Sequence, residues 1–376
     1  MSAQPQLTIV ASGLNNPRGL GFGPNGVLYV AEAGLGAGDE QGGFGLGLGF
    51  TGSITEIRDA GTPHPRWQRL VTGLVSVGDT EQGFPEVLGP DGLSVFGSGG
   101  IYVTIGESCL GELAKDPNLS TQARAQLGRL IKITPGGTWK VVANVGDFDY
   151  LWTGVNKDAP WAPADQFPDA NPYGVVAVSG RQYVADAGAN TINEVRPDGS
   201  VRIIAFVPNP MLPLPDGDLV PVSDAVPTCV ALGGDGFLYV GTLAFGANFG
   251  RFGPTAPPNW KTLPPQSKIY RVNPKKSGQF LTEANVWAAG FNPITACAFG
   301  NGALYVTEYA TEQSEYATGQ VVRVALQHNG SAGERTALGT GALHQPNGLA
   351  LGKGGGIYVS NYSISSGEGE VVRVNY

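Results

Sequence analysis

Residues 301–310 read NGALYVTEYA, and close copies of this stretch occur five more times along the chain. In each copy a turn precedes a Tyr-Val pair, and a polar residue often stands two positions after the valine. The six Tyr-Val pairs lie at residues 29–30, 102–103, 183–184, 239–240, 305–306 and 358–359. A pattern that recurs along a whole chain indicates a repeat architecture, in which each copy is one structural unit.

Each copy has the composition of a four-stranded antiparallel unit. A short apolar run before the turn predicts a first strand, the Tyr-Val run predicts a second, and runs such as GSITEIRD and GQVVRVAL predict a third. A fourth strand follows in five units, as in WQRLVTGL. Six such units predict an all-β fold, a six-bladed β-propeller of four-stranded antiparallel blades. A β-sandwich and an open solenoid are the alternatives.

The two ends of the chain favour the propeller over these alternatives. The sixth unit stops at Tyr376 after its third strand, and an additional strand, LTIVASGL at residues 7–14, precedes the first unit. We expect this N-terminal strand to complete the last blade, because circular closure leaves no unpaired sheet edge at either end of the array. The whole chain, residues 1–376, is then a single domain.

The composition argues against several classes of function. The 376 residues carry a formal charge of −8 and no run of Lys or Arg, so we expect no nucleic-acid partner. No apolar stretch is long enough for a transmembrane segment, and the first residues, MSAQPQ, do not have the pattern of a signal peptide. The sequence shows no nucleotide or haem motif. With only three histidines, it supports a zinc site or a Ser-His-Asp triad poorly.

The three cysteines, Cys109, Cys229 and Cys297, match no metal-binding spacing. Cys229 and Cys297 stand in apolar runs, so we expect them to be small buried residues. The pattern gives little weight to a catalytic role or to a disulfide.

The lengths of the loops point to one face of the propeller as the site. The turns between first and second strands are short, whereas the loops after the second strands and between blades are long, as at residues 32–52, 146–172 and 241–267. In an antiparallel meander the two kinds of long loop emerge on one face, the long-loop face, and the short turns form the opposite tight-turn face. Loops on a rigid scaffold commonly carry function, so we expect a small-molecule ligand or a protein partner to bind at the long-loop face.

Polar residues stand two positions after the valine in most units, where the second strand reaches the long-loop face. They are Glu32, Asp186, Thr242, Glu308 and Asn361, and Glu107 takes the place of Ile105 in the second unit. Carboxylate and amide oxygens that converge on one opening can bind Ca²⁺ or another divalent cation, so the acids and the amide of this set are candidate metal ligands. The alternative is that each side chain caps backbone N–H groups of the loop after its own strand.

A second set of polar residues accompanies the prolines at the start of the first strands. It consists of Asn16, Asn171, Asn292 and Asn347, and Arg18 follows the proline of the first unit. Proline suits strand entry because no ladder donor is needed there. Since the first strands line the propeller axis, we expect these side chains at the mouth of the channel on the long-loop face, as ligand-binding residues.

The segment 147–173 connects two blades on the long-loop face and is rich in aromatic residues. Trp152 and Trp161 are candidates for stacking on a planar ligand. The alternative is that these aromatic side chains pack against the rim and bury one another.

One short stretch has the signals of a helix. NLSTQARAQLG, residues 118–128, contains Ser120 as a favoured N-cap and ends at Gly128, a favoured stop. It is the only stretch for which the sequence predicts a helix.

Four stretches together resemble the ScyD/ScyE family of bacterial propeller proteins. They are LNNPRGLGFGPNGVLYVAEAG, NPYGVVAVSGRQYVADAGANTINEVRPDGS, VPTCVALGGDGFLYVGTLAF and ITACAFGNGALYVTEYA, and the resemblance covers nearly the whole chain. It implies a six-bladed propeller and an association with the biosynthesis of scytonemin, an indole-phenol pigment. Because relatives are commonly exported, it also implies a periplasmic or secreted protein. A cytoplasmic location is the alternative, and the N-terminus itself does not decide between the two, because an exported protein whose signal peptide has been removed would begin in the same way. The third unit, with Asp186 and Asn190, also resembles an NHL repeat.

Three functions follow from these observations. The first is the binding or biosynthetic conversion of an aromatic small molecule, and the second is a non-catalytic NHL-like binding or assembly module on the same face. The third is a calcium-dependent hydrolase that resembles lactonases, which the scarcity of histidine, the usual general base, disfavours. Whether the protein is an enzyme stays open, because the fold does not imply a reaction.

Overall fold

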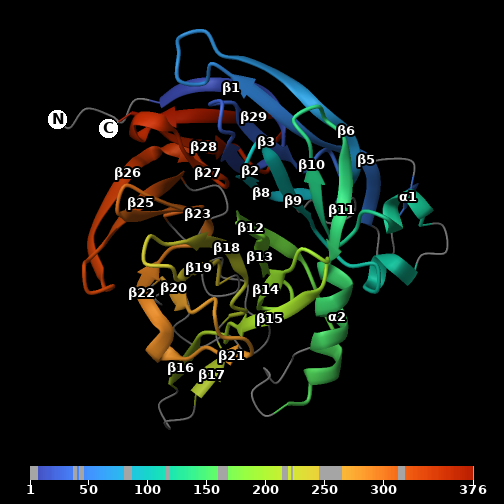
Figure 1. Ribbon diagram of the computed structural model, residues 1–376, viewed down its shortest axis with the longest axis vertical. Coiled ribbons are helices and arrows are strands. Elements are labelled where there is room, and N and C mark those ends of the chain that lie inside the picture. Colours follow the sequence, from blue (N-terminus) through green and yellow to red (C-terminus); the bar gives the residue numbers. More distant parts are fainter. Residues whose placement is uncertain are drawn as a thin grey trace.

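A computed structural model of the protein describes residues 7–36, 40–41, 46–79, 87–115, 119–159, 168–213, 219–221, 223–244, 265–311 and 318–375. Figure 1 shows small sheets arranged in a circle around a central axis. Six mainly antiparallel sheets form the blades, so the predicted six-bladed β-propeller is confirmed.

Each blade is built from strands that follow one another outward from the axis. The first blade contains β2 (Pro17–Phe22), β3 (Leu28–Glu32), β5 (Leu46–Arg58), β6 (Arg66–Asp79) and β7 (Val87–Leu88), with β4 (Glu40–Gln41) paired to β5. The second contains β8 (Pro90–Phe96), β9 (Gly100–Ile105), β10 (Arg129–Ile133) and β11 (Trp139–Asn144). The third contains β12 (Pro172–Val178), β13 (Arg181–Asp186), β14 (Thr191–Val195), β15 (Val201–Phe206) and β21 (Gln279–Phe280).

The other three blades follow the same plan. The fourth contains β18 (Pro227–Leu232), β19 (Leu238–Thr242), β20 (Ser267–Val272) and β22 (Val286–Phe291). The fifth contains β23 (Ile294–Gly300), β24 (Ala303–Glu308), β25 (Thr318–Leu326) and β26 (Ala332–His344). The sixth contains β27 (Leu349–Leu351), β28 (Ile357–Asn361), β29 (Ser366–Val374) and β1 (Leu7–Asn15). A separate hairpin is formed by β16 (Met211–Pro213) and β17 (Leu219–Pro221).

The circle of blades is closed by the N-terminal strand, as predicted. β1 runs antiparallel to β29, with Leu14 opposite Gly369. Val10 and Leu14 are buried in a cluster that includes side chains of the first and sixth blades, whereas Ile9, on the other side of β1, is exposed. The last blade is therefore completed by the beginning of the chain, and its outer strand packs against the first blade.

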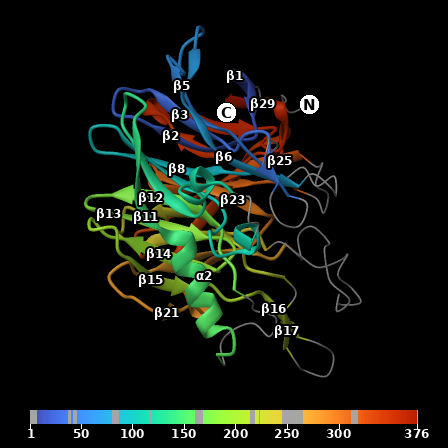
Figure 2. The same cartoon turned by 90° about the vertical axis from the view of Figure 1, so that its right-hand side faces the viewer.

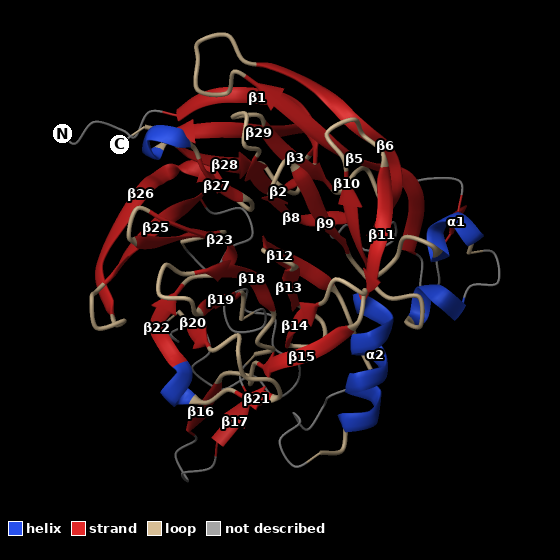
Figure 3. Ribbon diagram, in the orientation of Figure 1, coloured by secondary structure: helices blue, strands red, loops and turns tan. Residues whose placement is uncertain are grey.

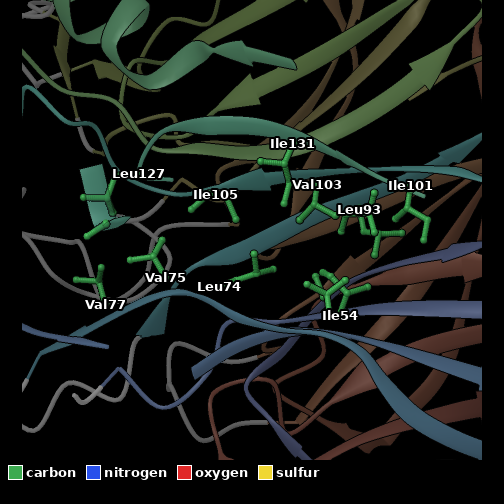
Figure 4. Close-up of a cluster of buried hydrophobic side chains, with 14 of the residues drawn as sticks. Ile54, Leu74, Val75, Val77, Leu93, Ile101, Val103, Ile105, Leu127 and Ile131 are labelled. Atoms are coloured by element: carbon green, nitrogen blue, oxygen red, sulfur yellow. The ribbon is translucent and has the colours of Figure 1, made fainter. Parts of the chain in front are cut away.

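The hydrophobic core lies between adjacent blades. Figure 4 shows one such cluster, in which Ile54 and Leu74 of the first blade meet Leu93 and Ile101 of the second. Because both faces of each sheet pack against a neighbouring sheet, a strand such as β3 is buried at every position. Burial on both faces explains why the Tyr-Val segments are continuously apolar and do not alternate with polar residues.

The innermost strands of neighbouring blades approach one another closely. A Cβ atom at Gly92 would lie 2.2 Å from the carbonyl oxygen of Tyr173, and a Cβ atom at Gly348 would lie 2.0 Å from the carbonyl oxygen of Arg18. Both distances are too short for any side chain, so only glycine allows the backbones to pack in this way.

Of the two α-helices in the described part of the chain, one was predicted from the sequence and the other was not. α1 (Thr121–Arg124) forms where expected, and Ser120 caps it by accepting the N–H of Ala123 at 3.1 Å. α2 (Val145–Asn156) lies in the aromatic connection for which the sequence predicted no helix. Its buried face includes Asp149 and Thr153, so the segment lacks the apolar periodicity by which amphipathic helices are recognised.

The helices lie outside the circle of blades. Figures 2 and 3 show α2 on the outer side of the propeller, beside the third blade. Three short 3₁₀ helices accompany the strands at η2 (Glu112–Lys115), η4 (Glu283–Asn285) and η5 (Lys353–Gly355). In the described parts of the chain, every helix is too short or too polar to span a membrane.

Cys229 and Cys297 form a disulfide, which corrects the expectation of two separate buried cysteines. Cys229 lies on β18 and Cys297 on β23, so the bond joins the innermost strands of the fourth and fifth blades. The two residues are 68 positions apart in sequence, and it is the order of the blades that places their strands side by side. Cys109 is a free cysteine.

We expect Leu14→Ala to lower the free energy of unfolding by about 2–4 kcal/mol, because it removes a fully buried side chain from the closing strand. Ile9→Ala is the matched control on the same strand, and it should change that free energy by less than about 1 kcal/mol because Ile9 is 56% exposed. Urea denaturation measures both values. Equal losses in the two variants would contradict the packing of β1 described above.

Under denaturing conditions without reductant, we expect one thiol per chain, that of Cys109, to react with a thiol reagent. After reduction all three should react. The double variant Cys229→Ala/Cys297→Ala should lower the free energy of unfolding by about 2–4 kcal/mol, because the cross-link no longer restricts the unfolded chain. Cys109→Ala is the control and should abolish the reaction before reduction. Three reactive thiols in the unreduced protein would rule out the disulfide.

Candidate functional site

A cavity of about 440 Å³ runs along the propeller axis. It is lined by the innermost strands of all six blades, β2, β8, β12, β18, β23 and β27, together with residues next to them. Each of these strands pairs with a neighbour on one side, so its second edge faces the cavity. Backbone N–H and C=O groups along such an edge can bond a ligand. The cavity is the site candidate because every blade contributes to it.

One polar residue from each blade surrounds the axis near the start of the innermost strand. This polar ring consists of Arg18, Asp91, Tyr173, Thr228, Thr295 and Asn347, all of them buried. The last five line the cavity, and Arg18 lies next to Asp91. In the first five blades the pairing with the second strand is irregular at this point. A bulge redirects a side chain away from the regular alternation of a strand, and here it accompanies the residue that belongs to the ring.

A hydrogen bond crosses the axis between opposite blades. Asn347 Nδ2 donates to Tyr173 Oη at 2.6 Å, and the two residues belong to the sixth and third blades, which face each other in the circle. We call this pair the axial bar. Both side chains also line the cavity. The bar therefore lies at the end of the cavity that is nearer to the long-loop face.

The opposite end of the cavity is apolar. Phe22, Val95, Val178, Phe299 and Leu351 are half-buried there, next to the short turns that follow the innermost strands. The sequence predicted a site at the long-loop face. The described cavity instead extends from the polar ring near that face toward the tight-turn face, so it combines a polar floor with an apolar mouth.

The polar ring carries one acid and one base. Arg18 Nε lies 3.8 Å from Asp91 Oδ1, and Arg18 Nη2 donates to the carbonyl oxygen of Val87 at 2.9 Å. Both charged side chains are buried. Ca²⁺ takes six to eight oxygen ligands, usually with several carboxylates, whereas this ring offers a single carboxylate next to a guanidinium. The ring is therefore a poor donor set for Ca²⁺.

The residues two positions after the valine perform a common structural task in four blades. Each accepts the backbone N–H of a residue shortly before the innermost strand of its own blade. The pairs are Asn15 N with Glu32 Oε2 at 2.8 Å, Asn171 N with Asp186 Oδ1 at 2.7 Å, Asn292 N with Glu308 Oε1 at 2.8 Å and His344 N with Asn361 Oδ1 at 2.7 Å. These four donors come from the connection between blades. Asp186 also accepts the N–H groups of Gly188 and Ala189, in the loop after its own strand, as the capping interpretation predicted.

The candidate metal ligands are distributed over separate blades. Glu32 pairs with Arg69 at 2.7 Å and accepts hydrogen bonds from Ser53 and Thr55. Glu107 stands at a left-handed position, φ 70°, just after β9. Among the residues that the structure describes, no group of three or more His, Cys, Asp and Glu side chains is arranged to hold a metal ion. A metal-binding role for Glu32, Glu107, Asp186, Glu308 and Asn361 stays a prediction.

The residues expected at the channel mouth separate into two groups. Arg18 and Asn347 belong to the polar ring. Asn16, Asn171 and Asn292 instead stabilise the chain where it enters the innermost strands. Asn16 Nδ2 donates to Gly34 O at 2.7 Å and Ser366 Oγ at 2.9 Å, Asn171 Oδ1 accepts the N–H of Glu107 at 3.3 Å, and Asn292 Nδ2 donates to Glu308 Oε2 at 3.1 Å.

Trp152, the aromatic candidate that the structure describes, does not line the cavity. Trp152 lies on α2 with its ring centroid 5.9 Å from that of Phe206, on the fourth strand of the third blade. This contact agrees with the alternative that the aromatic side chains of this segment pack against the rim. Trp161 lies outside the described residues.

Sequence reasoning did not single out four members of the polar ring, namely Asp91, Tyr173, Thr228 and Thr295. A signal for most of them is present, because proline stands directly before the ring residue at positions 17, 90, 172, 227 and 346. Glycine directly follows the ring residue in four of these five units. In two of these five units the sequence predicted the asparagine directly before the proline as a ligand-binding residue, but the residue at the axis is the one directly after the proline.

Two buried carboxyl groups hold α2 against the third blade. Asp149 Oδ2 accepts hydrogen bonds from Asn193 Nδ2 at 2.6 Å and from Thr191 Oγ1 at 3.1 Å, and Asp149 also contacts Asp186. Both acids are fully buried. Burial, together with the charge of Asp186, also raises the pKa of the nearby Asp169 to about 6.

The negative charge of the Asp149–Asp186 pair is not divided equally between the two carboxyl groups. Burial raises the pKa of Asp149 well above its usual range, and the carboxylate of Asp186 raises it further. Burial also raises the pKa of Asp186, but Asp186 Oδ1 accepts the N–H groups of Asn171, Gly188 and Ala189, which favour its ionised form. The proton therefore resides on Asp149, which donates it toward Asp186.

The chain resembles solved propellers in fold. No protein-family model matches it, and no curated protein does. A putative glucose dehydrogenase of Thermus thermophilus is 15% identical, with 99% of this chain and 100% of that chain covered and a TM-score of 0.53. The PQQ-bound aldose sugar dehydrogenase of Streptomyces coelicolor is 14% identical, with coverages of 99% and 98% and a TM-score of 0.53. A family AA12 carbohydrate-active enzyme of Trichoderma reesei is 13% identical, with coverages of 100% and 97% and a TM-score of 0.53. These likenesses show the fold alone.

We expect Asp149→Asn to make the protein more stable than the wild type at neutral pH. The folded-state pKa of Asp149 is raised, so its contribution to stability is full below about pH 4 and is lost as the pH rises through the folded value. Asparagine keeps the neutral form at every pH. Urea denaturation between about pH 4 and pH 8 should show the gap between variant and wild type growing with pH.

The control for this prediction is Asp158→Asn, because the side chain of Asp158 is 89% exposed. Its stability should follow that of the wild type at each pH. A gap between Asp149→Asn and the wild type that stays constant across the pH range would contradict a protonated Asp149.

Proposed function

We propose that the protein binds a small organic molecule in the axial cavity. The observation that carries this proposal is the division of one cavity into a polar floor, the polar ring, and an apolar mouth at the tight-turn face. Small-molecule sites are typically concave, about 300–1,000 Å³ in volume and mainly apolar with a few placed polar groups. The ligand enters with its polar end toward the ring and its apolar part between the innermost strands.

The ligand that fits this arrangement best is a flat aromatic molecule with a hydroxyl or N–H group. Phe22 and Phe299 at the apolar mouth supply aromatic surface for such a ligand. The resemblance to the ScyD/ScyE family supports the same class, because it implies an indole-phenol compound. We propose an indole- or phenol-like ligand on these two grounds, and scytonemin-related chemistry as its finer identity.

Binding is the activity that the geometry supports best. The acid and the base of the polar ring neutralise each other, and the threonines of the ring donate to backbone oxygens, as Thr228 Oγ1 does to Ile294 O at 2.6 Å. A lactonase-like hydrolase would need a divalent cation, for which the ring is a poor donor set. A protein partner on the long-loop face, with an assembly function, is the second proposal from the sequence.

We also propose that the protein works in an oxidising compartment, periplasmic or extracellular. The disulfide between Cys229 and Cys297 supports this location, because structural disulfides form and persist mainly in such compartments. The common export of relatives in the family that the sequence resembles agrees with it.

We expect indole and 4-ethylphenol to bind the wild type measurably by isothermal titration calorimetry, and glucose not to bind. Phe299→Ala should weaken binding of both aromatic probes by about five- to tenfold, because a wall of the apolar mouth is lost. Phe280→Ala is the matched control, since Phe280 is 48% exposed on β21 at the outer edge of the third blade. An equal loss in both phenylalanine variants, or no binding of either probe to the wild type, would refute the proposal.

A further inference from the structure

The axial bar divides the space along the propeller axis. Tyr173 stands on β12 in the third blade and Asn347 just before β27 in the sixth, and the hydrogen bond of 2.6 Å between their side chains crosses from one side of the circle to the other. The two residues are 174 positions apart in sequence. A molecule that enters from the tight-turn face meets this bar at the polar floor.

The Asn347 end of the bar is fixed by its neighbours. The backbone N–H of Asn347 donates to Ser360 O at 3.0 Å, and its carbonyl oxygen accepts Thr307 Oγ1 at 2.6 Å. Thr307 belongs to the fifth blade and Ser360 to the sixth. These two bonds fix the main chain from which the Asn347 side chain projects, and the burial of that side chain restricts its rotation.

The main chain at the Tyr173 end is fixed in a similar way. Its carbonyl oxygen accepts Thr104 Oγ1 of the second blade, and Gly92 on β8 packs so closely against that oxygen that a Cβ would not fit. Tyr173 is 8% exposed and Asn347 is 3% exposed. Breaking the hydrogen bond between two such buried polar groups costs free energy unless water or the ligand in the cavity replaces both contacts.

We infer that the Tyr173–Asn347 bar determines how far a ligand can enter the axial cavity, and hence how long a ligand the protein accepts. This inference rests on the proposed function of the cavity and names its specificity-determining residues. Ligand groups between the apolar mouth and the bar are buried and contribute to affinity. Groups beyond that length stay in water and contribute nothing, because the bar is anchored at both ends.

A series of 4-alkylphenols, from ethyl to octyl, tests this inference by isothermal titration calorimetry. Each added methylene that becomes buried should tighten binding by about fourfold, and in the wild type this gain should stop at a definite chain length. Tyr173→Ala removes one half of the bar, so the gain should continue for several more methylenes. Asn347→Ala, which removes the other half, should shift the limit in the same direction and serves if Tyr173→Ala folds poorly.

Tyr305→Ala is the matched control, because Tyr305 is a buried tyrosine on β24 that does not line the cavity. The Tyr305→Ala variant should be less stable than the wild type but should show the same limiting chain length. If the wild type binds the phenols and both bar variants show the same limiting chain length as the wild type, this inference is overturned. The proposed function then stays intact. If the wild type bound no phenol at all, the proposed function would fail, and the inference with it.

Discussion

The pairing of β1 with β29 is the interaction on which the rest of the structure depends. Each blade buries both faces against its neighbours, so a gap in the circle would expose two apolar sheet faces to water. The closing strand prevents this by placing Val10 and Leu14 in the cluster shared by the first and last blades. Closure also lets Asn16 reach Ser366, 350 positions away in sequence. The axis, and therefore the cavity, exists only because the two ends of the chain meet in one sheet.

Closure in turn brings six innermost strands close together, and this crowding creates the site. Glycine is required where backbones touch, as at Gly92 and Gly348. Next to Gly92 the strand bulges, and ring residues are bonded to neighbouring blades, as Tyr173 is to Thr104. The same residues thus hold the blades together and form the polar floor of the cavity. The proposed binding site is therefore part of the structural framework at this floor, which favours a rigid site over an adaptable one.

Residues that repeat and residues that vary have different roles in this propeller. The acid or amide after the Tyr-Val segment recurs in blade after blade and caps the same backbone N–H, as Glu32 and Glu308 do. Its recurrence reflects a structural requirement common to the blades. The ring position, in contrast, holds arginine, aspartate, tyrosine, threonine and asparagine in different blades, including Arg18 and Asp91. In a repeat protein, the positions that differ from repeat to repeat are the ones that can give an axial site its preference for a particular ligand.

The sequence by itself determined the number of blades, the order of their strands and the closure by the N-terminal strand, because these depend on local patterns that recur along the chain. It also indicated Arg18 and Asn347, which stand beside proline at strand entry. Only the tertiary structure decided the Cys229–Cys297 disulfide and the bond from Asn347 to Tyr173. Each joins residues from different blades, and the distance between them depends on the radius and order of the circle. The repeat pattern gives the order of the blades but not the distance between two strands, so it could not decide either bond.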